Sequence, residues 1–176
     1  MTRALGIDLS VSRTGLCLLP AGWCANGRLD WSMVLTAVVP GNELPRSAGQ
    51  DVRAKRLQEV RDAILDRTDH WDAAVAGFEQ YAFRARGFGA HDIAEVGGAV
   101  KVALHHRGIQ LHSFAQSTVR KTLLGKLPRR GAKQWVQAHC RDIGAPFWQD
   151  PDVCDAFAVA NHLLSVLGFR FVGMTP

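Results

Sequence analysis

Four acidic residues stand at positions from which their carboxylates could converge on one site. Asp8 ends one short apolar run, and Glu79 ends another. Asp152 and Asp155 are three residues apart and so share one face of an expected helix. Gathered carboxylates repel one another, and hard cations such as Mg²⁺ or Mn²⁺ relieve this by binding the oxygens. Two such ions about 3.5–4 Å apart activate water and stabilise the leaving oxygen in phosphodiester cleavage.

Each acid also has a purely structural interpretation. Asp8 could close a turn with a nearby serine, and Glu79 could pair with an arginine. Asp150 is placed to cap a helix, and Asp152 suits the positive end of the helix dipole. Asp155 lies farther along, among apolar residues, and capping does not explain it. Taken together, the four acids favour a site.

The elements that would position these acids can be predicted from hydrophobic periodicity. Strands are expected over residues 4–9, 15–19, 31–39, 72–78 and 109–114. Helices are expected over residues 53–67, 92–106, 116–124, 132–143 and 151–167. The first three strands are joined by short turns, and Asn26-Gly27 is a strong hairpin signal, so they predict an antiparallel meander.

The later strands alternate with helices, which predicts parallel strands joined by right-handed crossovers. The strand over residues 72–78 would then lie beside the first strand and parallel to it. Asp8 and Glu79 would meet at the same sheet edge, where sites of open α/β sheets lie. The expected fold is α/β, a mixed five-stranded sheet with helices on both faces.

Length and composition bound the remaining possibilities. The 176 residues are expected to form a single domain, residues 1–176. Apolar residues make up 47% and charged residues 21%, which excludes a disordered tail, a collagen-like chain and a disulfide miniprotein. A two-domain kinase or dehydrogenase would need a longer chain. The net charge of +5 leans weakly towards a polyanionic partner.

The cysteines and the N-terminus indicate a reducing compartment. None of the four cysteines forms a C-x-x-C pair, so free thiols are expected. Asp8 interrupts the N-terminal apolar run, so a signal peptide is not expected, and no stretch is long enough to span a membrane. We therefore expect the protein in the cytoplasm, with no membrane partner.

The order and spacing of several motifs resemble the RuvC Holliday-junction resolvases, within the ribonuclease H-like nuclease superfamily. The resemblance runs from about residue 4 to residue 165. Its motifs are Gly6-Ile7-Asp8 with Thr14-Gly15, Phe78-Glu79-Gln80, and Asp152-x-x-Asp155-Ala156-x-Ala158-Val159-Ala160. Matching segments between them are Val96-Gly97-Gly98-Ala99-Val100, Thr118-Val119-Arg120-Lys121 with Gly125, and Ala132-Lys133.

The resemblance implies a structure-selective DNA endonuclease that resolves four-way junctions by symmetric paired nicks. It assigns Asp8, Glu79, Asp152 and Asp155 as the acids that bind two Mg²⁺ ions, with Mn²⁺ as a substitute. Lys133 joins them as a catalytic residue that, like Arg120, neutralises phosphate charge. It also implies a homodimer, which suits the two-fold symmetry of the substrate. A branch-migration motor as a further partner stays unknown.

Two departures from the family's pattern concern the surroundings of the acids. Leu9-Ser10 replaces the usual Pro-Gly after the first acid. Ala82 stands where an aromatic residue usually stacks at the junction core, and its neighbours Tyr81 and Phe83 are the candidates to replace that residue. The compact, divergent chain looks like a bacteriophage version of the family, which would place it in the host cytoplasm.

Two basic segments are candidate DNA contacts. The loop at residues 125–133 lacks the Walker A pattern, but its cations can bind DNA phosphates. The segment after Glu79 combines cations and aromatic residues. The expected DNA-binding residues are Arg120, Lys121, Lys126, Arg129, Arg130, Lys133, Tyr81, Phe83, Arg84 and Arg86.

Three other functions compete with junction resolution. A broader branched-DNA or flap nuclease would use the same fold and acids. A non-catalytic junction-binding module would bind without cleaving, and the four acids argue against it. Half of an actin-like ATPase would also open with Gly6-Ile7-Asp8, but the chain is short and has no second set of phosphate loops.

Overall fold

A computed structural model of the chain describes residues 1–10, 12–25, 28–41, 48–80, 88–126 and 130–169. Its main sheet has five strands in the order β5-β2-β1-β6-β7. Their bounds are Arg3–Asp8 (β1), Arg13–Pro20 (β2), Leu35–Pro40 (β5), Val75–Glu79 (β6) and Gln110–Phe114 (β7). β2 is antiparallel to β1 and β5, whereas β1, β6 and β7 are parallel. The predicted mixed sheet is therefore confirmed, including the pairing of its first and fourth strands.

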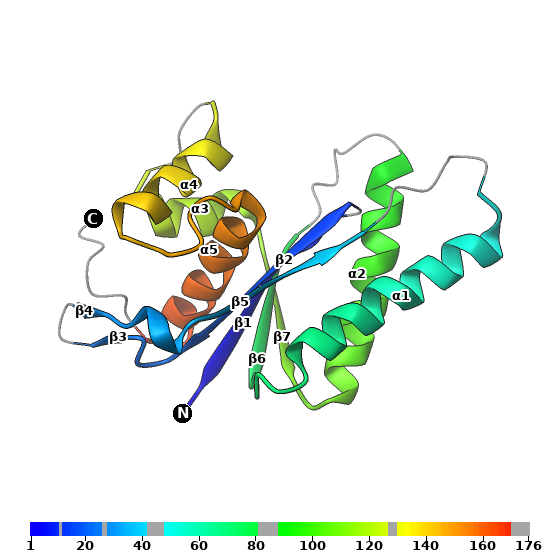
Figure 1. The fold of residues 1–176 in the computed structure, drawn as a ribbon, viewed down its shortest axis with the longest axis horizontal. Helices are drawn as coiled ribbons and strands as arrows, with labels where there is room; N and C mark the ends of the chain where they lie inside the picture. Colours follow the sequence, from blue (N-terminus) through cyan, green and yellow to red (C-terminus); the bar gives the residue numbers. More distant parts are fainter. Residues whose placement is uncertain (11, 26–27, 42–47, 81–87, 127–129, 170–176) are drawn as a thin grey trace.

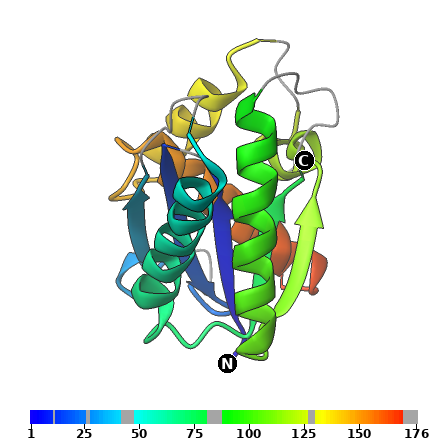
Figure 2. The ribbon, with the colours of Figure 1, turned by 90° about the vertical axis from the view of Figure 1, so that its right-hand side faces the viewer.

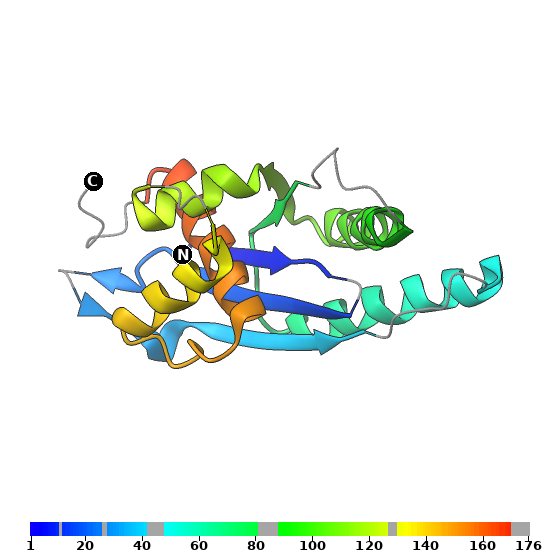
Figure 3. The same cartoon turned by 90° about the horizontal axis from the view of Figure 1, so that it is seen from above.

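Helices cover both faces of this sheet, as expected (Figure 1). Their bounds are Gln50–Thr68 (α1), Phe88–His106 (α2), Gln116–Leu124 (α3), Ala132–Asp142 (α4) and Pro151–Val166 (α5). α1 and α2 lie side by side over one face (Figure 2). α5 packs on β1 and β2 from the other face, and α3 and α4 flank it (Figure 3).

Side-chain alternation along the strands divides the core into these two layers. On β1, Leu5 and Ile7 are fully buried in the cluster formed with α1 and α2. Ala4 belongs to the opposite cluster, formed with α3, α4 and α5. Gly6 faces the same layer as Ala4, because its missing side chain would meet α5. Asp8, two residues farther on, is directed to the α5 side as well.

Two glycines allow α5 to lie directly on the strands. A Cβ atom at Gly6 would stand 2.0 Å from the carbonyl oxygen of Ala156, and one at Gly15 would stand 2.2 Å from the carbonyl oxygen of Asp152. Both neighbours are backbone atoms of α5, which cannot swing aside as a flexible side chain can. The missing side chains therefore set how closely the first two turns of α5 approach β1 and β2.

The prediction of one strand over residues 31–39 is wrong for the first residues of that range. Trp31–Met33 form a single 3₁₀ turn, and the strand begins only at Leu35. Asp30 caps this turn by accepting from the backbone N–H of Ser32 at 3.1 Å and from its hydroxyl at 2.5 Å. Such local hydrogen bonds between side chain and backbone compete with the backbone hydrogen bonds of a β-sheet. The hairpin predicted at Asn26-Gly27 does not lead into this strand. The residues on either side of it, β3 (Cys24–Ala25) and β4 (Arg28–Leu29), pair as a separate small sheet.

The expected free thiols are confirmed, and three of the four cysteines are buried. In the described ranges, every helix is too short or too polar to cross a bilayer.

Gly6→Ala tests the packing of α5 on the sheet. The new methyl group would collide with helix backbone, so we expect a loss of roughly 1–3 kcal/mol or more in the free energy of unfolding, as for other overpacked cores. Urea unfolding of the metal-free protein measures it. The control is Gly49→Ala at the N-cap of α1, an exposed position with open space around it. It should change the free energy of unfolding by no more than about 1 kcal/mol. Equal unfolding midpoints for the two variants would contradict the close approach.

Candidate active site

Asp8 and Glu79 end neighbouring parallel strands. The β1–β6 register pairs Ile7 with Phe78, so the next residue of each strand is one of the two acids. Glu79 lies on the α5 side of the sheet, since Phe78 belongs to the opposite layer. The predicted convergence of Asp8 and Glu79 at one sheet edge is confirmed.

The first two turns of α5 bring the other two acids to the same place. Asp150 caps the helix, accepting from the N–H of Asp152 at 3.1 Å and of Val153 at 3.3 Å. The structural interpretation of Asp150 as a helix cap is therefore confirmed. It does not explain Asp152, whose carboxylate is bound by side chains instead. The side chain of Asp155 is only 4% exposed.

Burial and mutual repulsion act most strongly on Asp8. Burial raises the pKa of this carboxyl group to about 7, and the charges of Asp155 and Glu79 add to the shift. Lys133 opposes the shift only in part. A carboxyl group with so high a pKa lacks a full counter-charge for its ionised form.

Glu79 and Asp155 are shifted in the same direction. Burial raises the pKa of Glu79, against a hydrogen bond from Gln116, whose amide donates to Glu79 Oε2 at 2.7 Å. Burial also raises the pKa of Asp155, against the attraction of Arg120 and Lys133. Three of the four acids thus carry raised pKa values in one small region. Such clusters of perturbed carboxyl groups occur preferentially at functional sites.

Two basic side chains, Arg120 of α3 and Lys133 of α4, form ion pairs with the acids of α5. Lys133 Nζ lies 2.7 Å from Asp152 Oδ1 and 3.6 Å from Asp155 Oδ2. Arg120 Nη2 lies 3.4 Å from Asp155 Oδ2. Burial lowers the pKa of Lys133, but the hydrogen bond to Asp152 and the attraction of Asp155 and Asp8 outweigh it and leave the pKa raised. The ammonium group is therefore held charged between two acids.

The residues present fit a divalent cation by their chemistry. Buried Oε1 of Glu79 and Oδ1 of Asp155 have no hydrogen-bond partner, which is costly for carboxylate oxygens unless a cation or water reaches them. All four groups are the hard oxygen donors that such ions prefer. As the side chains stand in the described residues, no three of them are gathered tightly enough to hold a metal ion. Lys133 supplies positive charge between Asp152 and Asp155 instead.

The other predicted DNA contacts either form no ion pair with these acids or lie outside the described residues. Lys121, Lys126 and Arg130 are exposed on α3 and on the segment between α3 and α4. Within the part of the chain that the structure describes, none of these three forms an ion pair with the acids. The predicted contacts outside the described residues are Tyr81, Phe83, Arg84, Arg86 and Arg129.

Sequence reasoning missed two side chains of the site. Gln116 holds Glu79, and Arg13 forms ion pairs with Asp150 and Asp152. The signal for Arg13 was its place two residues before Gly15, on the same face of the strand. The signal for Gln116 was its place just after the strand that pairs with Glu79.

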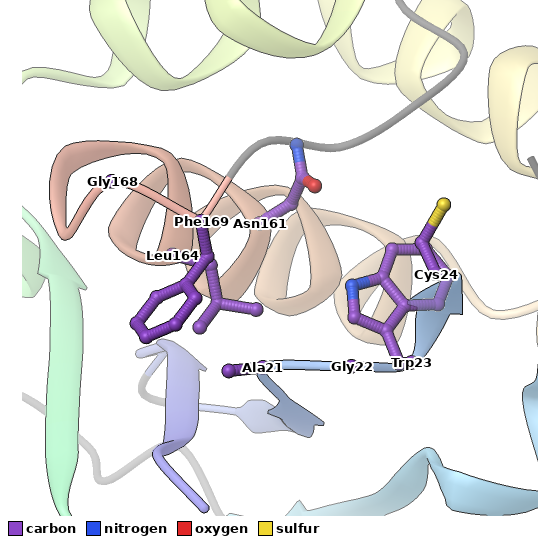
Figure 4. Close-up of a pocket in the computed structure, with 8 residues that line it drawn as sticks. All are labelled: Ala21, Gly22, Trp23, Cys24, Asn161, Leu164, Gly168 and Phe169. Atoms are coloured by element: carbon purple, nitrogen blue, oxygen red, sulfur yellow. The ribbon is translucent and has the colours of Figure 1, made fainter. Parts of the chain in front are cut away.

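A pocket elsewhere on the protein is separate from the acids. It has a volume of about 290 Å³ and lies against the C-terminal half of α5 (Figure 4). Its lining is formed by Ala21, Gly22, Trp23, Cys24, Asn161, Leu164, Gly168 and Phe169. Among the described residues that line it, none is acidic or basic. The candidate active site is the acidic cluster at the N-terminal end of α5.

Comparison with known proteins relates the chain to one protein family. Residues 4–162 match the family model described as crossover junction endodeoxyribonuclease RuvC. A curated relative of that name from Corynebacterium jeikeium is 26% identical over 172 residues, covering 91% of this chain and 98% of the relative. Another, from Corynebacterium diphtheriae, is 27% identical over 157 residues, covering 89% and 90%.

Solved structures share the architecture at lower identity. Thermus thermophilus RuvC in complex with a Holliday junction substrate superimposes with a TM-score of 0.68 at 19% identity, covering 96% of this chain and 98% of that one. The yeast mitochondrial Holliday junction resolvase Ydc2 gives 0.58 at 13% identity, covering 90% and 76%. These matches confirm the expected ribonuclease H-like sheet. By its family match along most of its length, the chain belongs to the RuvC family of crossover junction endodeoxyribonucleases.

Proposed function

We propose that the protein is a metal-dependent endonuclease that resolves four-way DNA junctions by hydrolysing one phosphodiester bond in each of two strands. The convergence of four acids, Arg120 and Lys133 at one edge of the sheet carries the proposal. Membership of the RuvC family supports it, and one solved relative is described as a complex with a Holliday junction substrate.

The acids are the proposed ligands of two Mg²⁺ ions, with Mn²⁺ as a substitute. The ligand set is Asp8, Glu79, Asp152 and Asp155. Bound ions of this kind supply an activated water and stabilise charge on the leaving oxygen. The chain's own contribution is to hold four oxygen donors together against their mutual repulsion, at a place where burial raises the pKa of Asp8 to about 7.

The two cations have different proposed roles. The side chain of Lys133 is 42% exposed, so its ammonium group can reach a DNA phosphate from its place beside Asp152. That of Arg120 is only 12% exposed, and it pairs with Asp155 at 3.4 Å. Lys133 therefore neutralises the scissile phosphate, and Arg120 adds positive charge while holding Asp155.

DNA outside the acidic cluster is proposed to run along α3 and the segment that follows it. Lys121, Lys126 and Arg130 are exposed there, and Arg129 belongs to the same basic stretch. Cations of this kind bind the phosphate backbone without reading sequence. We assign contacts at the junction core to the segment after Glu79, by way of Tyr81, Phe83, Arg84 and Arg86.

Two cuts at one junction require two sites, whereas each chain supplies one set of acids. We therefore propose a two-fold homodimer, whose symmetry matches that of the junction. A groove of about 560 Å³ between α1 and α2 includes Leu65, Gly98 and Val102 in its lining, and Val102 is 57% exposed. The α2 side of this groove, formed by Gly98, Ala99, Val102 and Ala103 beside His106, is the proposed dimer contact.

Asp8→Asn tests the catalytic assignment. The amide keeps the size of the carboxyl group but loses its charge for a metal. We expect junction nicking to fall by roughly 100-fold or more, since even indirect supports of a metal site are worth about 10–100-fold. The assay is cleavage of a labelled four-way junction, with linear duplex and flap DNA alongside, in Mg²⁺ and in EDTA. Asp66→Asn, an exposed acid of α1, is the control and should cleave normally.

The substrates separate the competing functions. Paired symmetric nicks confined to the junction, absent in EDTA, are the expected result. Equal cutting of flaps would reassign the protein as a broader branched-DNA nuclease. Tight junction binding without cleavage in either Mg²⁺ or Mn²⁺ would refute the enzyme and leave a binding module.

Asp8→Asn should also change the thermal stability, with one effect in the absence of metal and another in its presence. Without metal, Asp8→Asn removes a buried carboxylate that is repelled by Asp155 and Glu79, so its thermal midpoint should rise. Added Mg²⁺ should raise the midpoint of the wild type but not that of the variant, because a ligand stabilises only the state that binds it. Each kcal/mol corresponds to about 2–4 °C for a chain of this size. An identical response to Mg²⁺ in both proteins would remove Asp8 from the ligand set.

Val102→Glu tests the dimer contact. A charge placed in an apolar contact must be desolvated, so we expect sedimentation velocity to show a monomer, with the paired character of the nicks lost. Val52→Glu on α1 is the matched control, since Val52 is 53% exposed. That variant should remain dimeric. A dimer that persists in Val102→Glu would place the contact elsewhere.

A further inference from the structure

Arg13 joins the strand next to Asp8 with the helix that carries the other acids. It is the first residue of β2 and stands opposite Pro40 of β5. Its Nη2 donates to Asp150 Oδ2, and its Nε lies 3.2 Å from Asp152 Oδ2. The guanidinium group is planar and presents its N–H groups in a fixed fork, which suits two carboxylates at once.

Asp150 divides its two carboxylate oxygens between two tasks. Oδ1 caps α5 by accepting from the N–H groups of Asp152 and Val153. Oδ2 accepts from Arg13. Asp150 thus ties the position of the guanidinium group to the first turn of the helix.

Asp152 is held from both sides by two different cations. Its Oδ1 accepts from Lys133 Nζ at 2.7 Å, and its Oδ2 faces Arg13 Nε at 3.2 Å. One cation per oxygen fixes the plane of the carboxylate as well as its position. Lys133 alone would leave the group able to rotate about its bond to the methylene carbon.

The backbone around Arg13 is itself fixed against α5. Gly15, two residues along and on the same face of β2, lies so close to Asp152 that a Cβ atom there would stand 2.4 Å from its carbonyl carbon. β2 therefore contacts the first turn of α5 twice, once through the missing side chain of Gly15 and once through the fork of Arg13.

We propose that Arg13 is a positioning residue for DNA hydrolysis, which orients the carboxylate of Asp152 by linking it to the cap residue Asp150. This inference rests on the proposed nuclease function. Its side chain is 49% exposed, but Nε and Nη2 both face carboxylates, so it acts on the acid and not on the DNA.

Steady-state cleavage of a four-way junction by Arg13→Ala and Arg13→Lys tests the role. We expect Arg13→Ala to lower kcat by roughly 10–100-fold, the usual effect of removing a group that orients a ligand. KM and the junction Kd in EDTA should stay within about twofold, because the DNA contacts remain. Arg13→Lys should restore part of kcat, since an ammonium group can serve one carboxylate but has no fork.

A double-mutant cycle with Asp150→Asn tests the link to the cap. The amide oxygen still caps the helix, but one of the two carboxylate charges that hold Arg13 is lost. Arg13→Ala should therefore reduce kcat less in the Asp150→Asn background than in the wild type. Arg141→Ala is the control, since it removes an exposed Arg–Asp pair of α4, at 3.0 Å, and should leave kcat unchanged.

Three results would overturn the proposal. Weaker junction binding with kcat intact would make Arg13 a phosphate contact. A lower thermal midpoint with kcat and KM intact would leave it a purely structural residue. A crystal structure of Arg13→Ala in which Asp152 keeps its orientation would also refute it. That structure needs no activity, so it tests Arg13 even if the wild type proves unable to cleave, a result that would instead refute the proposed function.

Discussion

The direct contact between the backbone of α5 and two strands of the sheet is the constraint on which the site depends. Gly6 and Gly15 have no side chain where β1 and β2 pass under the helix, and a methyl group at either would overlap backbone atoms of α5. The helix that carries Asp152 and Asp155 thus lies against the strand that ends in Asp8. Rigid backbone sets the spacing of the acids, which suits a site that must hold several ligands in fixed geometry.

This closeness has an electrostatic cost. Asp8, Glu79 and Asp155 all have raised pKa values, with burial as the largest cause in each. Arg120 and Lys133 offset part of the repulsion, but Asp8 stays the most perturbed. The apolar remainder of α5, including fully buried Phe157, supplies the packing that keeps the acids together. A chain without bound cations therefore holds its site at the expense of stability.

Local sequence patterns predicted most of this arrangement. What they missed are side-chain contacts between elements that lie far apart in the sequence. Apolar runs and the crossover rule placed Asp8 beside Glu79, because both depend only on strand order. Arg13 and Gln116 were missed because a strand pattern gives the face or the edge on which a side chain lies, but not its distance from a partner on another element. The turn at Trp31 was missed for the opposite reason. The hydrogen bonds from Ser32 to Asp30 span only two residues, whereas strand periodicity is recognised over a longer run of residues.

Side-chain alternation makes the site inseparable from the core. On β1, Leu5 and Ile7 enter the layer of α1 and α2, whereas Gly6 and Asp8 face α5. A slip of one residue in the pairing would send every side chain to the other face. It would press large apolar groups against the backbone of α5 and bury Asp8 beneath α1 and α2. The apolar residues of β1 therefore fix the face of the sheet on which Asp8 lies, so a core substitution that shifted the register would move this acid away from Asp152 and Asp155.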